Sequence, residues 1–273
     1  MNPNENVAGQ SDRQSLPSHY CKLLGLEITP ITLHGLLSFL ASALSTPDTR
    51  IVAAHNLHSA YLFHTDSEFR SFYRRADIIL TDGAPVQWDY KFSKGKSENH
   101  RMGSTDWIPK LNLIEGLDRV SVVGASSDSN RKFVAWLEKL LPHAAVQGIP
   151  GEGWNMTKST AAARLIQDFS PQLILIGIGM PRQELFADHL KKASVPAVIS
   201  TIGGAIDQLA GVQKNAPRWT GKLGIEWLWR LLTQPTRLWR RYLIEPWKLL
   251  WVRLLRRHRK HDSASEKSTT HSD

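Results

Sequence analysis

Short, continuous runs of apolar residues recur along residues 22–211, and each run ends in a polar or glycine-rich exit. Runs that are apolar on both faces suit the interior strands of a parallel sheet, because helices cover both sides of such a sheet. The five runs are IVAAHN (51–56), DIILTDG (77–83), RVSVVGA (119–125), QLILIGIG (172–179) and AVISTIGG (197–204). We therefore expect at least five buried strands.

The stretches between these runs are typical of amphipathic helices. They include HSAYLFHTDSEFRSFYRRA (58–76), SNRKFVAWLEKLLP (129–142), KSTAAARLIQDFS (158–170) and RQELFADHLKKA (182–193). Alternating strands and helices predict an α/β fold, a doubly wound and mainly parallel Rossmann-like sheet. Ligands of such folds bind beyond the carboxyl ends of the strands, where Asn56, Asp82 and several glycines lie.

The chain changes character after residue 211. Residues 212–261 hold thirteen Lys or Arg against two acidic residues, and six of the ten tryptophans. The formal net charge of +9 therefore belongs to this end of the chain. Pro235 and Pro246 are expected to separate helices here. In the last helix, Trp247, Leu250, Trp251 and Leu254 follow an i, i+3, i+4, i+7 spacing that predicts one apolar stripe between cations.

These shifts in composition divide the chain into four segments. We expect a disordered leader (1–20), an α/β domain (21–211), a basic, aromatic-rich helical appendage (212–260) and a disordered polar tail (261–273). Cys21 is the only cysteine, so the chain cannot form an intramolecular disulfide. No secretory signal and no uncharged apolar run of about 20 residues is present, which predicts a cytoplasmic protein.

Three short motifs carry candidate chemistry, and each also has a purely structural interpretation. Asp82 could take a proton from a substrate hydroxyl, although Asp-Gly is also a common turn pair. In IGIGMPRQE (176–184), Arg182 occupies the third glycine position of a dinucleotide fingerprint, which disfavours a nicotinamide site. The helix that starts there could meet a phosphate or simply be capped. RVSVVGASSDSNRKF (119–133) resembles a glycine and serine loop that opens a helix, which could seat a diphosphate but is not specific alone.

Taken in order, these motifs resemble the WecG/TagA/CpsF family of bacterial glycosyltransferases. The resemblance covers residues 50–242 and includes ADxxxxDG, RxGxxD, GxGxPRQE, GGAxD, IEWLWRL and QPxRxxRRY. It implies an inverting, metal-independent hexosyltransferase that moves a sugar from a UDP-sugar to a polyprenyl-diphosphate-linked saccharide. The setting would be bacterial surface or exopolysaccharide biosynthesis, without a cofactor and with possible homo-oligomers. Histidines without metal-ligand spacing agree with this expectation.

The resemblance also assigns roles to individual residues. Asp82 matches the general base that deprotonates the acceptor hydroxyl. The acceptor would contact Asn56, Arg101, Asp106, Arg230, Arg237 and Arg240. The nucleotide-sugar would contact Gly124, Trp154, Gln183, Glu184 and Asp207. The chain departs from the family pattern at Ala54, where many members have a threonine. A hydrogen bond from that hydroxyl would be lost here or supplied by His55 or His58. It departs again at Asn215, which stands in place of an arginine.

The basic terminus has three possible explanations. An apolar stripe flanked by cations suits a helix that lies in an anionic membrane interface, on the inner face of the cell membrane. Alternatively the stripe packs on the core of its own domain, with the charges in solvent. As a third possibility, the protein is a basic nucleic-acid-binding or membrane-surface protein without catalysis. We expect no nucleic-acid partner, because no nucleic-acid-binding module is legible.

Overall fold

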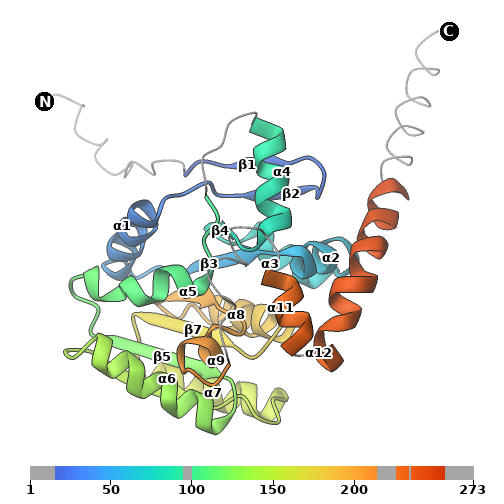
Figure 1. Cartoon of the computed structure of the whole chain (residues 1–273). Coiled ribbons are helices and arrows are strands. Elements are labelled where there is room, and N and C mark those ends of the chain that lie inside the picture. Colours follow the sequence, from blue (N-terminus) through green and yellow to red (C-terminus); the bar gives the residue numbers. More distant parts are fainter. Residues whose placement is uncertain (1–15, 95–99, 214–225, 234, 256–273) are drawn as a thin grey trace, which may run out of the picture.

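The structure of the chain is a computed structural model that describes residues 16–94, 100–213, 226–233 and 235–255 (Figure 1). Six side chains within these ranges also lie outside the description, those of Lys94, Glu226, Trp227, Arg230, Arg237 and Tyr242.

The centre of the fold is a six-stranded parallel sheet with the order β4-β3-β8-β7-β5-β6. The five predicted strands are confirmed as β3 (Arg50–His55), β4 (Ile78–Thr81), β5 (Arg119–Gly124), β7 (Leu173–Gly177) and β8 (Val198–Thr201). Strand β6 (Ala145–Ile149), at one edge, was not predicted. The chain crosses from β4 to the far side of the sheet before returning to β7 and β8, which confirms the doubly wound α/β fold.

Alternate residues of the strands enter two separate cores, one on each face of the sheet. Val52, Val122 and Leu175 pack with α1 (Leu33–Leu44), α5 (Ser104–Trp107), the 3₁₀ helix η1 (Ile108–Leu113), α6 (Ser127–Leu140) and α9 (Ala205–Leu209). Ile51, Val123 and Ile174 pack on the other face with α3 (Ser67–Arg74), α7 (Met156–Phe169) and α8 (Arg182–Lys192). Two buried faces explain why the strands read as continuous apolar runs.

The long amphipathic stretch 58–76 forms two helices where one was predicted. These are α2 (Leu57–Thr65) and α3, and Asp66 separates them. Its carboxylate oxygen accepts the amide protons of Glu68 and Phe69 at 2.9 and 3.0 Å, which caps α3 at its first turn.

An antiparallel hairpin and one helix extend the domain beyond the parallel sheet. Strands β1 (His19–Cys21) and β2 (Leu26–Ile28) pack through Cys21 and Ile28 against Val86 and Tyr90 of α4 (Ala84–Lys94). Strand β1 begins inside the segment 1–20 that we expected to be a leader. Residues 1–15 and the predicted tail 261–273 lie outside the described residues.

The C-terminal segment contains α11 (Glu226–Thr233), α12 (Pro235–Trp239), a π-helical turn (Arg240–Ile244) and a helix over 245–255. The prediction that Pro246 separates two helices is wrong, because the chain stays helical across it. Proline cannot donate a backbone hydrogen bond. The chain adapts by a π turn just before it, in which the Glu245 amide donates to the Arg240 carbonyl oxygen five residues earlier.

The terminal helix 245–255 contacts the domain through one face only. Leu249, 3% exposed, packs with Leu26 and Ala60. The predicted stripe points the other way, with exposed fractions from 46% at Leu254 to 72% at Trp247. The structure therefore does not support packing of this stripe on the protein's own core. Among the described residues, no helix is both long and apolar enough to span a bilayer.

Candidate active site

A cleft of about 580 Å³ opens at the carboxyl ends of β3, β4, β7 and β8. The C-terminal helices, orange and red in Figure 1, form its other wall. Of the residues assigned from the sequence, five line this cleft, and they are Asn56, Asp82, Gln183, Asp207 and Arg240. The fold thus brings residues from five separate parts of the chain to one place.

Asp82 follows β4 and lines the cleft. Its amide donates to the His55 carbonyl oxygen at 2.8 Å, which ties the residue to the end of the neighbouring strand. A β-carbon on Gly103 would lie 3.2 Å from Asp82 Oδ1, so glycine at that position lets the loop approach the carboxylate. The hydrogen bond to His55 and the close approach of Gly103 therefore fix the position of Asp82 in the cleft.

The R-x-G-x-x-D loop, residues 101–106, supports Asp82. Arg101 forms a parallel bridge with Thr81, and the Met102 amide donates to the Thr81 carbonyl oxygen at 2.8 Å. Asp106 Oδ2 accepts the Gly103 amide proton at 2.8 Å and so caps α5. Arg101 and Asp106, which we assigned to acceptor contact, are not among the cleft-lining residues, whereas Gly103 is.

Asn56 has two roles in the structure. Its Oδ1 accepts the Ser59 amide proton at 3.0 Å and thereby caps α2. The same oxygen accepts a hydrogen bond from Arg241 Nη2 at 3.3 Å. Asn56 is therefore fixed by the first turn of α2 and held in contact with the C-terminal segment.

Three charged residues of the C-terminal segment face the cleft, and two of them were not predicted. These are Arg240, Arg241 and Glu245, of which sequence reasoning selected only Arg240. Glu245 Oε2 lies 2.5 Å from His58 Nδ1, and both side chains are less than a fifth exposed. The i to i+5 turn before Pro246 turns residues 240 and 245 toward one face. Arg230 and Arg237 belong to α11 and α12, but their side chains lie outside the described part of the chain.

Glycines form the floor of the cleft through contacts between strand ends. A β-carbon on Gly124 would lie 2.4 Å from the Gly177 carbonyl oxygen, and one on Gly177 would lie 2.5 Å from that of Gly203. No side chain fits at either point. Gly124 itself is behind the lining residues, so its assigned role at the nucleotide-sugar is indirect in this structure.

Gln183 and Glu184 occupy the first turn of α8 and are both fully buried. Gln183 Nε2 donates to Glu184 Oε1 at 2.8 Å. Within the described residues, Gln183 Oε1 and Glu184 Oε2 have no hydrogen-bond partner. Burial raises the pKa of Glu184 to about 7, while the hydrogen bond from Gln183 and the charge of Arg241 oppose that rise. Gln183 lines the cleft and Glu184 lies behind it.

Two features assigned to the nucleotide-sugar differ from the expectation. Trp154 is not among the lining residues and packs edge-on against Phe186, with ring centroids 5.0 Å apart. The possible diphosphate seat at the start of α6 holds the Glu152 carboxylate, which accepts hydrogen bonds from Ser127 N at 3.1 Å and Ser127 Oγ at 2.7 Å. A diphosphate could occupy this position only if Glu152 moved.

The departures from the family pattern can be partly located. Ala54 lines the cleft, so the missing hydroxyl would have faced it. His55 is fully buried, stacks on Tyr73 at 4.0 Å, and has its pKa lowered to about 3 by burial. His58 lines the cleft, so it is the histidine that could replace the hydroxyl. Asn215 lies outside the described residues.

In the described part of the chain, no three His, Cys, Asp or Glu side chains are grouped so that they could hold a metal ion. The cleft presents cationic groups instead, including Arg182, Arg240 and Arg241. Arginine guanidinium groups are suited to bind phosphate oxygens. The cleft can therefore place a carboxylate beside one substrate and cations beside a diphosphate.

Comparison with known proteins agrees with this chemistry. The sequence profile of the Glycosyl transferase WecG/TagA/CpsF family matches residues 21–263. The chain is 24% identical over 197 residues to the N-acetylglucosaminyldiphosphoundecaprenol N-acetyl-beta-D-mannosaminyltransferase of Bacillus subtilis (strain 168), covering 72% of this chain and 76% of the relative. It is 29% identical over 175 residues to the enzyme of the same name from Bacillus spizizenii (strain ATCC 23059 / NRRL B-14472 / W23), covering 63% and 66%. The chain belongs to the WecG/TagA/CpsF family and is a glycosyltransferase.

Proposed function

We propose that this glycosyltransferase moves a hexose from a UDP-sugar to a saccharide linked to polyprenyl diphosphate. The observation that carries the proposal is that Asp82 and the arginines of the C-terminal segment line one cleft. The names of the two Bacillus enzymes describe transfer to a sugar on diphosphoundecaprenol, which supports an acceptor of this class. The product would enter bacterial surface or exopolysaccharide biosynthesis.

Asp82 acts as the general base in this proposal. Its carboxylate accepts the proton of the acceptor hydroxyl while that oxygen attacks the anomeric carbon of the donor. The bond from the anomeric carbon to the diphosphate oxygen breaks on the opposite side, so the anomeric configuration inverts and UDP leaves. The leaving charge is stabilised by cationic side chains and backbone amides, so we expect transfer without a bound metal.

The remaining assignments follow from position in the cleft. Asn56, Arg240 and Arg241 are proposed to contact the acceptor and its diphosphate, together with Arg230 and Arg237. Gln183 and Asp207 are proposed to contact the donor. Arg101 and Asp106 are proposed to act through the loop that holds Gly103 beside Asp82, and Gly124 and Glu184 through the floor and wall behind the donor. Trp154 is retained as a donor contact only if its ring turns away from Phe186.

The membrane is the proposed site of action. The outward stripe of the terminal helix and the cations around it support peripheral attachment to the inner face of the cell membrane. Tryptophan is well suited to that interface because its ring is apolar and its N–H is polar. Attachment would keep the enzyme where a polyprenyl-linked acceptor resides.

A substrate screen tests the proposed function. Purified enzyme is incubated with a panel of nucleotide sugars and polyprenyl-diphosphate-linked monosaccharides, with and without EDTA, and the product linkage is determined by NMR. We expect one UDP-sugar to be used, an inverted linkage, and equal rates in EDTA. Transfer to free sugars at the same rate as to lipid-linked ones would contradict the assigned acceptor, and retention of configuration would contradict the mechanism.

A further inference from the structure

The turn between β1 and β2 joins two helices that are distant in sequence. The amides of Leu23 and Leu24 donate to the two carboxylate oxygens of Asp89 on α4, at 3.1 and 2.7 Å. From the other side, Arg253 donates from Nε to the Leu23 carbonyl oxygen at 3.1 Å. Its Nη2 donates to the Lys22 carbonyl oxygen at 2.9 Å. Helix α4, the turn and the terminal helix 245–255 therefore form one continuous unit.

Helix α4 and the turn carry large apolar side chains on their outer side. Trp88 and Phe92 are 50% and 80% exposed and lie four residues apart, on one face of α4. The opposite face of α4 packs on the hairpin through Val86 and Tyr90. Leu23, at the tip of the turn, is 66% exposed. We refer to Leu23, Trp88 and Phe92 as the α4 surface.

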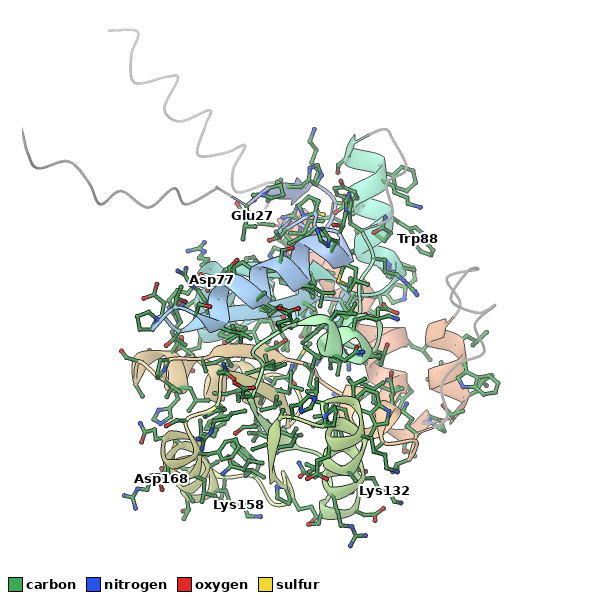
Figure 2. All side chains as sticks on the ribbon, turned by 90° about the vertical axis from the view of Figure 1, so that its left-hand side faces the viewer. Glu27, Asp77, Trp88, Lys132, Lys158 and Asp168 are labelled. Atoms are coloured by element: carbon green, nitrogen blue, oxygen red, sulfur yellow. The ribbon has the colours of Figure 1, made fainter. Side chains whose placement is uncertain are left out.

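The α4 surface lies on the same side of the molecule as the C-terminal helices. Figure 2 shows Trp88 on the side of α4 where those helices lie. Glu27, on strand β2 of the hairpin that packs on α4, lies on the opposite side. Lys22, in the turn between β1 and β2, and Lys248, in the terminal helix, are exposed. Lys91, on α4, is half-buried. Aromatic residues with lysines around them match an anionic bilayer interface in both polarity and charge.

We propose that the α4 surface is a second membrane-contacting surface, which enters the anionic lipid interface together with the terminal helix. The proposal rests on the membrane attachment proposed above and extends it to a part of the catalytic domain. Helix α4 begins two residues after Asp82, and the C-terminal segment carries Arg240 and Arg241 into the cleft. Contact on both sides of the cleft would hold its opening toward the bilayer that contains the acceptor's lipid.

An environment-sensitive probe tests both contacts in the full-length protein. Cys21 is buried and burial raises its pKa to about 12, so a cysteine introduced at the surface is the reactive thiol for labelling. We would place a nitrobenzoxadiazole label at Phe92→Cys, at Trp251→Cys on the terminal helix, and at Met156→Cys, an 81% exposed control on α7. Each protein is mixed with phosphatidylglycerol–phosphatidylcholine vesicles.

With vesicles, we expect the fluorescence emission of the label at positions 92 and 251 to shift to the blue and to be protected from iodide quenching. The emission of the label at position 156 should not change. A shift at 251 without one at 92 would overturn the α4 surface while leaving membrane attachment intact. No shift at either position would overturn the proposal and membrane attachment together. Protection at 92 that depends on protein concentration and needs no vesicles would show that a second copy covers α4, which also overturns it.

An unlabelled variant gives a second measurement. The double substitution Trp88→Gln with Phe92→Gln should lower binding to anionic vesicles by about tenfold or more, because two large aromatic side chains no longer leave water. Leu113→Gln, which removes another exposed apolar residue (63% exposed), should leave binding unchanged. Turnover of a water-soluble acceptor analogue should be the same in all three proteins, which separates attachment from chemistry. Equal vesicle binding by the double variant would refute the α4 surface.

Discussion

The two walls of the cleft are built in different ways. The wall formed by the α/β domain consists of strand ends packed through glycines, where Gly124 and Gly177 leave no room for a side chain. The wall formed by the C-terminal segment is the helical stretch 235–255, held by Leu249, Arg253, Arg241 and the pair of Glu245 with His58. The first wall is as rigid as the sheet. The second depends on a few contacts whose loss should affect one substrate more than the other.

The largest expected effect concerns the carboxylate between the two walls. Asp82→Asn removes the proton acceptor and should lower turnover by about 1,000-fold, the scale of general-base catalysis. Donor binding, measured by calorimetry with UDP, should change little because the fold around β4 is unaltered. Asp128→Asn, a surface substitution on α6, is the control. Turnover within a few-fold of wild type would remove Asp82 from the role of base.

Replacement of Arg240 or Arg241 in the C-terminal wall should have the second largest effect. Arg241→Ala removes a cation that contacts Asn56 and lies near buried Glu184. We expect a rise in KM for the lipid acceptor of about 10- to 100-fold, the scale of a charged hydrogen bond, and a similar rise for Arg240→Ala. Arg131→Ala, on the exposed face of α6, should have no effect. If KM for the donor rose instead, the arginines would belong to the other substrate.

Removal of the pair between His58 and Glu245 should raise KM for the lipid acceptor by a smaller factor. Glu245→Gln and His58→Ala each weaken the attachment of the C-terminal wall, and we expect a rise in acceptor KM of about 3- to 10-fold. Since the two side chains interact directly, the double variant should be little worse than either single one. Steady-state kinetics of the four proteins measures this coupling. Fully additive effects would show that the pair does not act as a unit.

Glu184 lies behind the first wall, and its replacement should alter stability more than turnover. Burial raises its folded pKa to about 7 from the ordinary value of 4.5, so the folded protein becomes less stable as pH rises through that range. Glu184→Gln removes this pH-dependent loss. Between pH 5 and pH 8, the difference in free energy of unfolding between variant and wild type should move by about 2 kcal/mol in the variant's favour.

Urea unfolding at the two pH values measures this difference. Glu138→Gln, an exposed substitution on α6, is the matched control and should show no such change. A constant difference across the pH range would mean that Glu184 does not titrate there.

The fold was largely predictable because each interior strand is apolar on both faces. The apolar run QLILIGIG signals β7, whose first four residues, Leu173 to Ile176, are buried. Strand β6 was missed because it lies at the sheet edge, where Gln147 and Gly148 interrupt the apolar pattern. The separation of α2 from α3 depends on Asp66, a polar residue inside an otherwise continuous amphipathic stretch.

The site was less predictable than the fold. Asn56, Asp82 and Asp207 follow strands or begin helices, so local sequence indicates them. Arg241 and Glu245 contact Asn56 and His58 across 185 and 187 residues, and no local pattern reveals such pairs. The Pro246 error has the same origin, since a π turn depends on how the helix docks. The only local signal for Arg241 and Glu245 is that charged residues are frequent in the stretch just before Pro246.

The glycine contacts in the floor also limit how sugar preference can change among relatives of this enzyme. Positions without room for a β-carbon cannot acquire a new recognition group by substitution. Divergence of donor choice would then be confined to the rim, to residues such as Arg182, Asp207 and Gln208. A mutational library aimed at a new donor should sample that rim and leave Gly124 and Gly177 as they are.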